Sequence, residues 1–463
     1  MRNAVTATSL VAAVLLGACG GTVRPPEPVT GPTGYVYPLG TPPSATFFSQ
    51  TATLFFRDQE YERALDLVLE GIAEDPGNPV HFLLAGMAYL SLDDFANAHE
   101  MFIEAQRIYP AYELDIEPAR EAAWGEAFNA GLGAYARGDV ERTMDLWNDA
   151  ARLYDLRPEA HRNLAGVLAT DGRYAEAIDV YRGAIAGLSK RSATFVFSEE
   201  DLRAREESNA SLEDQLVALL MLTERFAEAE PLLRRRLQRE PESVQVRSDL
   251  ANALNSLGRE SEARAIYAEL LSAGGLEATQ LFNLGVGLFR VEDFVGADEA
   301  FRRLIVVQPE SRDAWFNRAN VLFAMEGWTS LVEVSERLLE LDPLGQNALL
   351  IAARAQLEIG NRDAAVEILQ RVDMAPVYLE GLRLRRTGGG TTVEGQLTGN
   401  VAESGSPVDL LFSFFGDAGL VVGTATSTVE APPEGESVPF FVTFTGRALS
   451  YRYELVGAWV PQP

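Results

Sequence analysis

Cysteine is nearly absent from this chain: Cys19 is the only one in 463 residues. A lone thiol excludes an internal disulfide framework and the metal or redox motifs that are built on paired cysteines. Histidine is scarce too, and three imidazoles that stand far apart in the sequence make neither a metal cluster nor a proton relay. We therefore expect no metal site.

Catalytic signatures are also missing. His99 and Glu100 begin like the zinc-protease pattern HExxH, but Ile103 occupies the place of the second histidine, so two imidazoles cannot share one helix face. Residues 131–136 satisfy the dinucleotide-binding string GxGxxA, but they fall inside an expected helix, where glycine serves close helix packing. No nucleophile elbow or phosphate loop occurs. We expect a protein without catalytic residues or a cofactor.

Positive charge is outweighed by negative charge. The formal net charge is −28 at pH 7, and most of it lies between residues 46 and 375. Such a field repels a phosphate backbone, so we expect no nucleic acid partner, and basic or apolar partners fit better. A hydrophobic content of 47% indicates a folded chain. Its length exceeds one ordinary core, which predicts several domains or a repeat array.

The N-terminal residues have the pattern of a secretory signal. Arg2 precedes an apolar run over residues 10–18 that ends on small residues. This run is about nine residues long, whereas a helix that crosses a bilayer needs about 20, so the segment targets the chain without spanning a membrane. We predict a signal peptide over residues 1–18. In the plainest alternative, the cysteine that follows it is incidental or a buried free thiol.

Leu16, Gly17, Ala18 and Cys19 resemble the lipobox of bacterial lipoproteins. This resemblance implies that Cys19 receives a diacylglycerol and becomes the new N-terminus after cleavage. One acyl chain anchors a protein only marginally, while two or more hold it durably. The resemblance also implies sorting to the outer membrane, facing the periplasm, because Gly20 is not the aspartate that often retains such proteins at the inner membrane.

Residues 19–44 are rich in proline and carry few charges. Proline at this density favours an extended, semi-rigid conformation of the polyproline type. We predict that residues 19–44, beginning with the lipidated Cys19, form a tether that lifts the folded part off the membrane surface.

The central region repeats with a period of 34 residues. One packing position recurs at Ala229, Ala263, Ala297, Leu331 and Ala365. Pro76 and Pro110 are also one period apart, as are Pro309 and Pro343. Small residues let two antiparallel helices approach closely, an aromatic residue fills the gap, and the proline ends the second helix. Each unit is therefore predicted to be a helical hairpin.

This pattern resembles the tetratricopeptide repeat family over residues 45–373, which implies an α-solenoid of about nine helical hairpins. The units begin near Ala45, Pro79, Trp124, Pro158, Ala210, Val244, Ala278, Arg312 and Gln346. The third unit departs from the pattern, with Thr143 in the alanine position. Two longer spacings predict insertions near residues 111–121 and 192–209, as loops or extra helical turns. The second insertion is either a contact element or a cover on a neighbouring repeat.

After residue 376 the helical period ends and apolar residues alternate with a period of two. The expected strands cover residues 377–385, 392–401, 408–415, 420–429, 438–445 and 449–456. Six short strands in residues 376–463 predict a small β-sandwich domain. The order of residues 397–401, a hydrophobic strand and residues 439–441 loosely resembles the FxLYD type of immunoglobulin-like envelope domain, which implies no known activity.

In the tetratricopeptide repeat family, the first helix of each hairpin lines the inner surface of the solenoid. Helical periodicity assigns the inward positions of two adjacent units, and these are the candidates for a peptide groove: Phe282, Asn283, Phe289, Arg290, Phe316, Asn317, Asn320 and Phe323. Aromatic walls with amides that can pair an extended backbone suit peptide recognition. Alternatively, the asparagines belong to the repeat consensus and the phenylalanines pack between repeats. The family's carboxylate clamp, which uses lysines, is absent.

These patterns together predict a non-catalytic protein-binding scaffold that a lipid anchor holds in the bacterial cell envelope. Its expected partners are other proteins or peptides, bound on the inner surface of the solenoid. One alternative is a pilot lipoprotein for pilus or secretin assembly. Another is a regulator or recruiting subunit of an envelope hydrolase.

Overall fold

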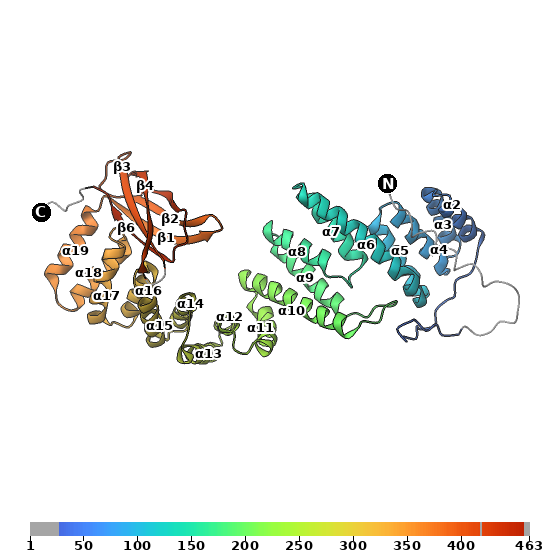
Figure 1. Ribbon diagram of the computed structural model, residues 1–463, viewed down its shortest axis with the longest axis horizontal. Helices are drawn as coiled ribbons and strands as arrows, with labels where there is room; N and C mark the ends of the chain where they lie inside the picture. The colour runs from blue at the N-terminus through green and yellow to red at the C-terminus, as the bar shows by residue number, and fades with distance from the viewer. Residues whose placement is uncertain (1–26, 417–418, 458–463) are drawn as a thin grey trace. The chain divides into compact units, whose positions relative to one another are not determined.

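Helices paired in sequence order make up most of the chain (Figure 1). The computed structural model describes residues 27–416 and 419–457. Within these residues, 18 α-helices form nine hairpins, each of two helices joined by a short turn. The predicted α-solenoid of about nine helical hairpins is confirmed, and strands follow it as expected.

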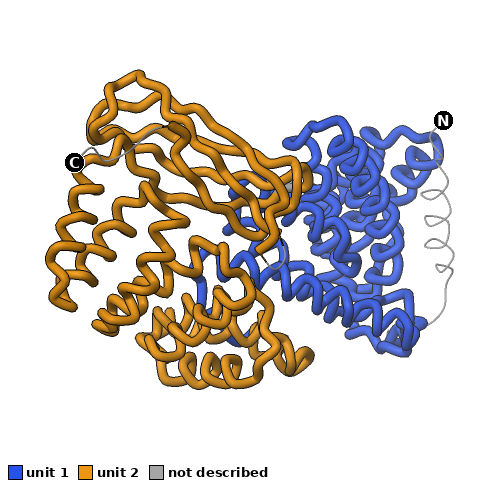
Figure 2. The backbone as a smooth tube through the Cα atoms, turned by 60° about the vertical axis from the view of Figure 1, so that its left-hand side comes forward, with its two compact units in different colours: residues 1–232 blue, residues 233–463 orange. Residues whose placement is uncertain are grey.

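The chain divides into two compact units, Met1–Leu232 and Leu233–Pro463 (Figure 2). Unit 1 contains the hairpins α2 (Phe47–Arg57) with α3 (Tyr61–Glu74), α4 (Pro79–Ser91) with α5 (Phe95–Ile108), α6 (Glu113–Ala136) with α7 (Val140–Leu153), and α8 (Glu159–Thr170) with α9 (Tyr174–Leu188). In the fifth hairpin, α10 (Glu199–Leu222) with α11 (Phe226–Arg239), the division between the units falls inside the second helix.

Unit 2 contains the remaining hairpins and all six strands. Its hairpins are α12 (Val244–Ser256) with α13 (Glu260–Ala273), α14 (Ala278–Arg290) with α15 (Phe294–Val307), α16 (Arg312–Ala324) with α17 (Trp328–Leu341), and α18 (Gln346–Glu358) with α19 (Arg362–Met374). No helix in the described part of the chain is both long enough and apolar enough to cross a bilayer.

Short polar residues cap many of these helices. The side chains of Asp94, Asp139 and Asp293 each accept a hydrogen bond from the backbone N–H three residues further on. Asn78 caps α4 in a similar way, and Pro79 follows it at the first helical position, where a missing N–H costs nothing. Caps of this kind stabilise a helix by about 1 kcal/mol each. They fix where these helices begin.

Every hairpin turn contains one residue in the left-handed region. Glycine occupies this position in four turns, at Gly138, Gly172, Gly258 and Gly360, and a side chain occupies it in five, at Gln59, Asp93, Glu224, Glu292 and Glu326. The positions from Glu224 to Gly360 follow one another at the 34-residue period, so the repeat fixes the backbone conformation of the turn as well as the packing. Left-handed backbone is costly for residues with a Cβ.

The predicted insertions lie in unit 1 and contact each other. Residues 110–121 form the 3₁₀ turn η2 (Pro110–Tyr112) and the first turns of the long helix α6. Residues 192–198 form a loop, after which α10 begins early at Glu199. The buried carboxylate of Glu117 accepts hydrogen bonds from the Ser192 hydroxyl and the Ala193 N–H, and from the Thr194 hydroxyl at 3.0 Å. The two insertions therefore form one structure.

The proline-rich segment folds onto this structure. Tyr37 is only 2% exposed, and the N–H of Thr41 donates to the carbonyl oxygen of Ile108 at 2.9 Å. The guanidinium of Arg191 lies 3.7 Å from the ring centroid of Tyr35, and it forms an ion pair with Glu113 at 2.6 Å. The expectation of an extended tether is thus wrong for residues 27–44, because two tyrosines give this segment a binding surface on the solenoid. Residues 19–26 lie outside the described residues.

The six strands form two antiparallel sheets. One has the order β1–β2–β5, with β1 (Val377–Thr387), β2 (Gly390–Gly399) and β5 (Ser437–Phe444), and the other has the order β4–β3–β6, with β4 (Val421–Glu430), β3 (Pro407–Phe415) and β6 (Ser450–Leu455). These bounds agree with the expected strands to within a few residues. Phe412, Phe414, Val393 and Leu397 belong to one core that both sheets share.

The sheets also pack on the last hairpins, so strands and helices in unit 2 are continuous (Figure 1). Leu344, from the turn between α17 and α18, is buried in the core of the sheets. Tyr378 of β1 is buried in the core of the helices, and its hydroxyl donates to the carbonyl oxygen of Val372 at 2.5 Å. The end of α19 and the start of β1 are therefore one packed junction.

Candidate functional site

The two helices of a hairpin meet where a small residue faces an aromatic ring. A Cβ added at Gly131 would lie 2.4 Å from Nε1 of Trp147, and one added at Gly86 or Gly285 would lie closer than 3 Å to the ring of its partner on the second helix. The GxGxxA string that includes Gly131 therefore serves helix packing, as predicted. This packing uses one face of each first helix.

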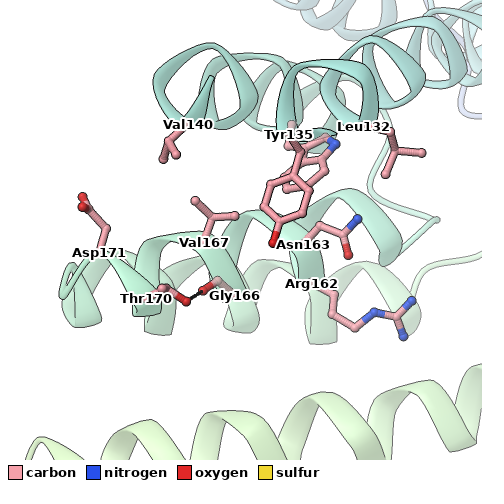
Figure 3. Close-up of a pocket in the computed structure, with 10 residues that line it drawn as sticks. Leu132, Tyr135, Val140, Arg162, Asn163, Gly166, Val167, Thr170 and Asp171 are labelled. Carbon is pink, nitrogen blue, oxygen red and sulfur yellow. Dashed lines mark hydrogen bonds between the residues drawn. The ribbon is translucent and has the colours of Figure 1, made fainter. Parts of the chain in front are cut away.

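A pocket of about 590 Å³ opens beside the Gly131–Trp147 contact, between the hairpin α6–α7 and helix α8 (Figure 3). Its apolar wall consists of Leu132, Tyr135, Val140 and Val167. Three of these side chains, Leu132, Tyr135 and Val140, are 42%, 57% and 43% exposed and line the same pocket, so they form an apolar patch rather than scattered apolar groups. The ring of Tyr135 stands over α8 in Figure 3.

Buried neighbours hold this wall in place. The ring centroids of Tyr135 and Trp147 are 5.7 Å apart, and Trp147 is 2% exposed. The indole N–H of Trp147 donates to the carbonyl oxygen of Phe128 at 3.3 Å. Because Gly131 leaves room for this indole, the wall of the pocket is fixed by the same contact that closes the hairpin.

The polar part of the pocket comes from α8. Arg162, Asn163 and Thr170 lie along it, and Asp171 stands at its C-terminal end. Within the described residues, the guanidinium of Arg162 and the carboxylate of Asp171 form no hydrogen bond and no ion pair. The hydroxyl of Thr170 donates to the carbonyl oxygen of Gly166 at 2.9 Å (Figure 3). The pocket thus presents two charges of opposite sign, of which Asp171 also interacts electrostatically with Arg173.

Two other arginines of this region are paired. Arg157 donates to Glu121 at 2.6 Å, and Arg173 binds the carboxylate of Glu176 through two nitrogens, each at 2.7 Å. Arg162 has no such partner among the described residues, and neither have Arg137, Arg142 and Arg152 of the same region. Arg162 is therefore available to a ligand.

The pocket residues occupy the repeat positions from which the peptide groove is predicted, but in other hairpins. Arg162 and Asn163 stand three and two residues before Ala165, just as Phe282 and Asn283 stand before Gly285. Tyr135 follows Gly131 by four residues, as Phe289 follows Gly285. The groove was predicted on α14 and α16 because their hairpins are adjacent and both match the repeat well, whereas Thr143 departs from the pattern in hairpin three. The repeat offsets alone would have found the pocket residues.

The predicted groove residues lie on α14 and α16, and several of the rings pack within their own hairpins. Phe282 meets Phe301 edge to face, with ring centroids 6.1 Å apart, while Phe289 lies 5.4 Å from Phe294. Phe289 keeps 37% of its surface exposed, and Asn283 is exposed. The guanidinium of Arg290 donates to the side-chain oxygen of Asn252 at 3.3 Å.

On α16, Arg312 lies over the ring of Phe316, and Phe323 meets Trp328 edge to face with centroids 5.4 Å apart. The amides of Asn317 and Asn320 each donate to the backbone carbonyl four residues earlier, at 2.7 and 2.9 Å. Both alternatives for these residues therefore have some support: the rings pack locally, yet Phe323 is 41% exposed. The groove on α14 and α16 remains a prediction.

The three histidines stand apart from the pocket. His81 and His161 are buried, and burial lowers the pKa of both imidazoles. Burial also lowers the pKa of His99. Nε2 of His81 lies 2.8 Å from the hydroxyl oxygen of Thr46, which shows a packing role. No group of three potential ligands from His, Cys, Asp and Glu is placed to hold a metal in the described part of the chain.

Comparison with known proteins identifies the repeat. Models of the tetratricopeptide repeat match residues 128–192, 220–280 and 347–372. The first of these segments contains the pocket, and the third covers most of the last hairpin. No curated protein matches the sequence.

Several solved structures are similar over part of the chain. A tetratricopeptide repeat protein from Parabacteroides merdae is 14% identical and has a TM-score of 0.37, with 54% of this chain and 91% of that one covered. YrrB, described as a tetratricopeptide repeat protein with an unusual peptide-binding site, is 19% identical with a TM-score of 0.32, covering 37% and 89%. MamA from Desulfovibrio magneticus is 15% identical with a TM-score of 0.32, covering 35% and 92%. The family models show that the chain contains tetratricopeptide repeats.

Proposed function

We propose that this protein is a non-catalytic scaffold of the bacterial cell envelope that binds a segment of a partner protein on the first helices of hairpins three and four. One observation carries the proposal: a pocket of about 590 Å³ that combines partly exposed apolar side chains with the polar side chains of Arg162 and Asn163. An aromatic wall beside convergent polar groups is typical of peptide-binding sites. Tetratricopeptide repeats serve protein interaction, which agrees with this site.

The proposal includes a lipid anchor at Cys19, which lies outside the described residues. Its support is the lipobox-like order of Leu16, Gly17, Ala18 and Cys19. We expect a fatty-acid analogue to label the wild type, and Cys19→Ser to release the protein from membranes. Membrane retention of an unlabelled protein would contradict the anchor. Fractionation of the two membranes then tests the proposed outer-membrane location.

Photocrosslinking tests the binding site. A photoreactive residue is placed at Tyr135 in one variant and at Tyr174 in a control variant. Tyr174 begins α9, is 37% exposed and takes no part in the pocket. We expect irradiation of intact cells to give discrete protein adducts from position 135 and none from position 174. Equal adducts from both positions, or none from either, would contradict the site.

The groove predicted on α14 and α16 is a second candidate surface, because Phe289 and Phe323 remain partly exposed. We expect Phe289→Ala with Phe323→Ala to lower partner recovery with little change in the melting temperature. A fully buried phenylalanine typically loses about 3 to 5 kcal/mol of stability when it is replaced by alanine. We expect a smaller loss for Phe289 and Phe323, because both rings are already partly exposed. A large fall in melting temperature, or unchanged recovery from a folded variant, assigns both rings to packing.

A further inference from the structure

Two loops of unit 1 lie side by side, away from the pocket. Residues 29–37 form a narrow hairpin within the N-terminal segment, and residues 192–198 belong to the connection between α9 and α10 (Figure 1). The guanidinium of Arg191 covers the ring of Tyr35, and a Cβ added at Gly31 would lie 3.5 Å from a backbone carbonyl oxygen of the second loop. Side chains that leave the two loops are therefore neighbours.

These loops carry a patch of exposed apolar side chains. Val36, Phe195 and Val196 each expose more than half of their surface, and Tyr35 exposes 40%. We call these four residues the loop patch. Apolar residues that are exposed singly are common on protein surfaces, whereas a cluster marks a contact with a protein or a membrane.

Neighbouring side chains hold the loop patch in place. Tyr37 is buried, so Val36, the residue before it in an extended segment, points the other way. In the second loop, the guanidinium of Arg205 lies 4.2 Å from the ring centroid of Phe197, and Phe195 meets Phe197 edge to face with centroids 5.4 Å apart. The exposed side chains thus stand on loops that are already ordered, which lowers the entropy cost of binding.

The predicted lipid anchor brings these loops close to a bilayer. Ten residues separate Cys19 from Val29, where the hairpin begins, and a chain advances by at most about 3.6 Å per residue, so the hairpin lies within about 36 Å of the cysteine. Because residues 27–44 dock on unit 1 instead of extending, the loops cannot move farther from the anchor while the segment is docked.

We propose that the loop patch contacts the bilayer that holds the lipid anchor, with Phe195 and Val196 at the boundary between headgroups and acyl chains. Apolar side chains bind at this boundary, and tyrosine is favoured at the headgroup level. The contact orients unit 1 on the membrane. This proposal rests on the anchor that is part of the proposed function, and it names the surface that faces the lipid.

The charges beside the loop patch favour a zwitterionic lipid surface. Lys190 pairs with Asp155 at 2.5 Å, and Arg191 pairs with Glu113 at 2.6 Å, so both cations already have a carboxylate partner. The net charge of the chain is −28, which repels an anionic bilayer. The contact therefore depends on burial of the apolar side chains and not on ion pairs with headgroups.

The single thiol allows this contact to be measured whether or not cells attach a lipid to it. The protein that begins at Cys19 keeps every described residue, and its thiol is coupled to a maleimide lipid in phosphatidylcholine vesicles. A fluorescent non-natural residue replaces Val196 in one variant and Leu222 in the control. These side chains are 64% and 61% exposed, and α10 separates them by about 35 Å. Lipids that carry a nitroxide on the acyl chain quench a residue that reaches the bilayer.

We expect quenching at position 196 to be at least about threefold stronger than at position 222, because an interfacial apolar group lies about 5–10 Å into the boundary. Anionic phosphatidylglycerol in the vesicles should weaken the quenching at position 196. Equal quenching at the two positions, or none at position 196, overturns the proposal. Stronger quenching in anionic vesicles would contradict the zwitterionic surface.

A weaker anchor reveals the affinity that the loop patch adds. When the thiol carries one acyl chain, binding to vesicles is marginal and reversible. We expect Val196→Ser to lower the partition coefficient of this protein about three- to tenfold, and the control Leu222→Ser to leave it unchanged. Both side chains are largely exposed, so neither substitution should change the melting temperature. An unchanged partition coefficient for Val196→Ser would contradict the contact.

The outcomes separate this proposal from the anchor on which it rests. If position 196 is not quenched in vesicles although a fatty-acid analogue labels Cys19 in cells, the anchor stands and the loop patch faces water or another protein. If position 196 is quenched in vesicles but Cys19 stays unlabelled in cells, the contact is a property of the loops and the proposed anchor alone fails.

Discussion

At the scale of single residues, the repeat is a set of contacts between a small residue and a ring. Gly131 and Trp147 are one such pair, and Gly133, two residues along the same helix, is not part of any. A Cβ at Gly133 would meet only the end of the flexible side chain of Arg137, at 3.4 Å. Substitutions at the two glycines therefore distinguish the effect of close packing from the effect of helix propensity.

We expect Gly131→Ala to destabilise unit 1 by about 1 to 3 kcal/mol, because the added methyl group overlaps the indole of Trp147. Gly133→Ala is the control, and it should be neutral or stabilise α6 by up to about 1 kcal/mol, as alanine does in a helix. Urea unfolding followed by tryptophan fluorescence measures both. Similar effects of the two substitutions would show that the hairpin does not depend on this contact.

A buried ionic network acts at the same scale in unit 2. The carboxylate of Asp342 is fully buried and accepts hydrogen bonds from two nitrogens of Arg312, at 2.9 and 2.6 Å, and from the hydroxyl of Tyr453. The N–H of Leu344 donates to the oxygen of that hydroxyl at 3.2 Å. Burial raises the pKa of Tyr453, so this hydroxyl keeps its proton. The network connects α16, the end of α17 and β6.

We expect Asp342→Ala to destabilise unit 2 by about 3 to 5 kcal/mol, because it leaves Arg312 buried without its partner. The control is Asp313→Ala, which removes a second and partly exposed partner of the same arginine, with an expected cost of at most about 1 kcal/mol. Thermal unfolding followed by circular dichroism compares them. A small effect of Asp342→Ala would mean that the sheets do not depend on this network.

At the scale of elements, the hairpin turn offers a stabilising change. Glu292 and Glu326 hold φ angles of 58° and 55°, where glycine pays no steric penalty. We expect each of Glu292→Gly and Glu326→Gly to stabilise unit 2 by about 0.5 to 1 kcal/mol. Glu260→Gly, in the first turn of α13, is the control and should destabilise. Loss of stability in the turn variants would mean that the glutamate side chains contribute contacts that outweigh the backbone strain.

The docked N-terminal segment is the second element to test. Tyr37→Ala removes a ring that is 98% buried, so we expect residues 27–43 to detach and their amide hydrogens to exchange at least tenfold faster. The control, Leu39→Ala, removes a side chain that is already 60% exposed and should leave exchange unchanged. Hydrogen–deuterium exchange with mass spectrometry measures both. Unchanged exchange in Tyr37→Ala would show that other contacts hold the segment.

The same segment shows where prediction from sequence stops. The 34-residue period located all nine hairpins, because it reports contacts between neighbours in the chain, and alternation located the strands for the same reason. Composition suggested an extended tether, but the conformation of residues 27–44 depends on Tyr35 meeting Arg191 far along the chain. The groove on α14 and α16 stays a prediction, and the pocket lies at corresponding repeat positions in other hairpins, since the period alone does not tell which hairpin forms a pocket.

At the scale of the whole molecule, the titratable groups are divided unequally between the units. All three histidines, His81, His99 and His161, lie in unit 1, and burial lowers the pKa of each. Unit 2 contains no histidine. A pH change near neutrality therefore changes the protonation of imidazoles in unit 1, whereas unit 2 has no imidazole to protonate.

The sign follows from proton linkage. A histidine with a lowered pKa binds fewer protons in the folded state than in the unfolded state, so folding is favoured above the unfolded pKa of about 6.5 and weakened as the pH falls below it. Burial raises the pKa of the carboxyl groups of Asp115 and Asp149 in the same unit, which gives a contribution of the opposite sign. A histidine substitution is needed to separate the contribution of the histidines from that of the carboxyl groups.

We expect unit 1 to lose stability between pH 7.5 and 5.5, and His161→Gln to make this loss smaller, because glutamine does not titrate. The quantity compared is the change in unfolding free energy between the two pH values, so any constant cost of the substitution cancels. Hydrogen–deuterium exchange resolves the two units, and amides of α8 and α9 should show the change while those of α14 and α15 show a smaller one. An equal pH dependence in the wild type and His161→Gln would mean that protonation of His161 does not weaken the fold, and that the loss of stability comes from His81 and His99.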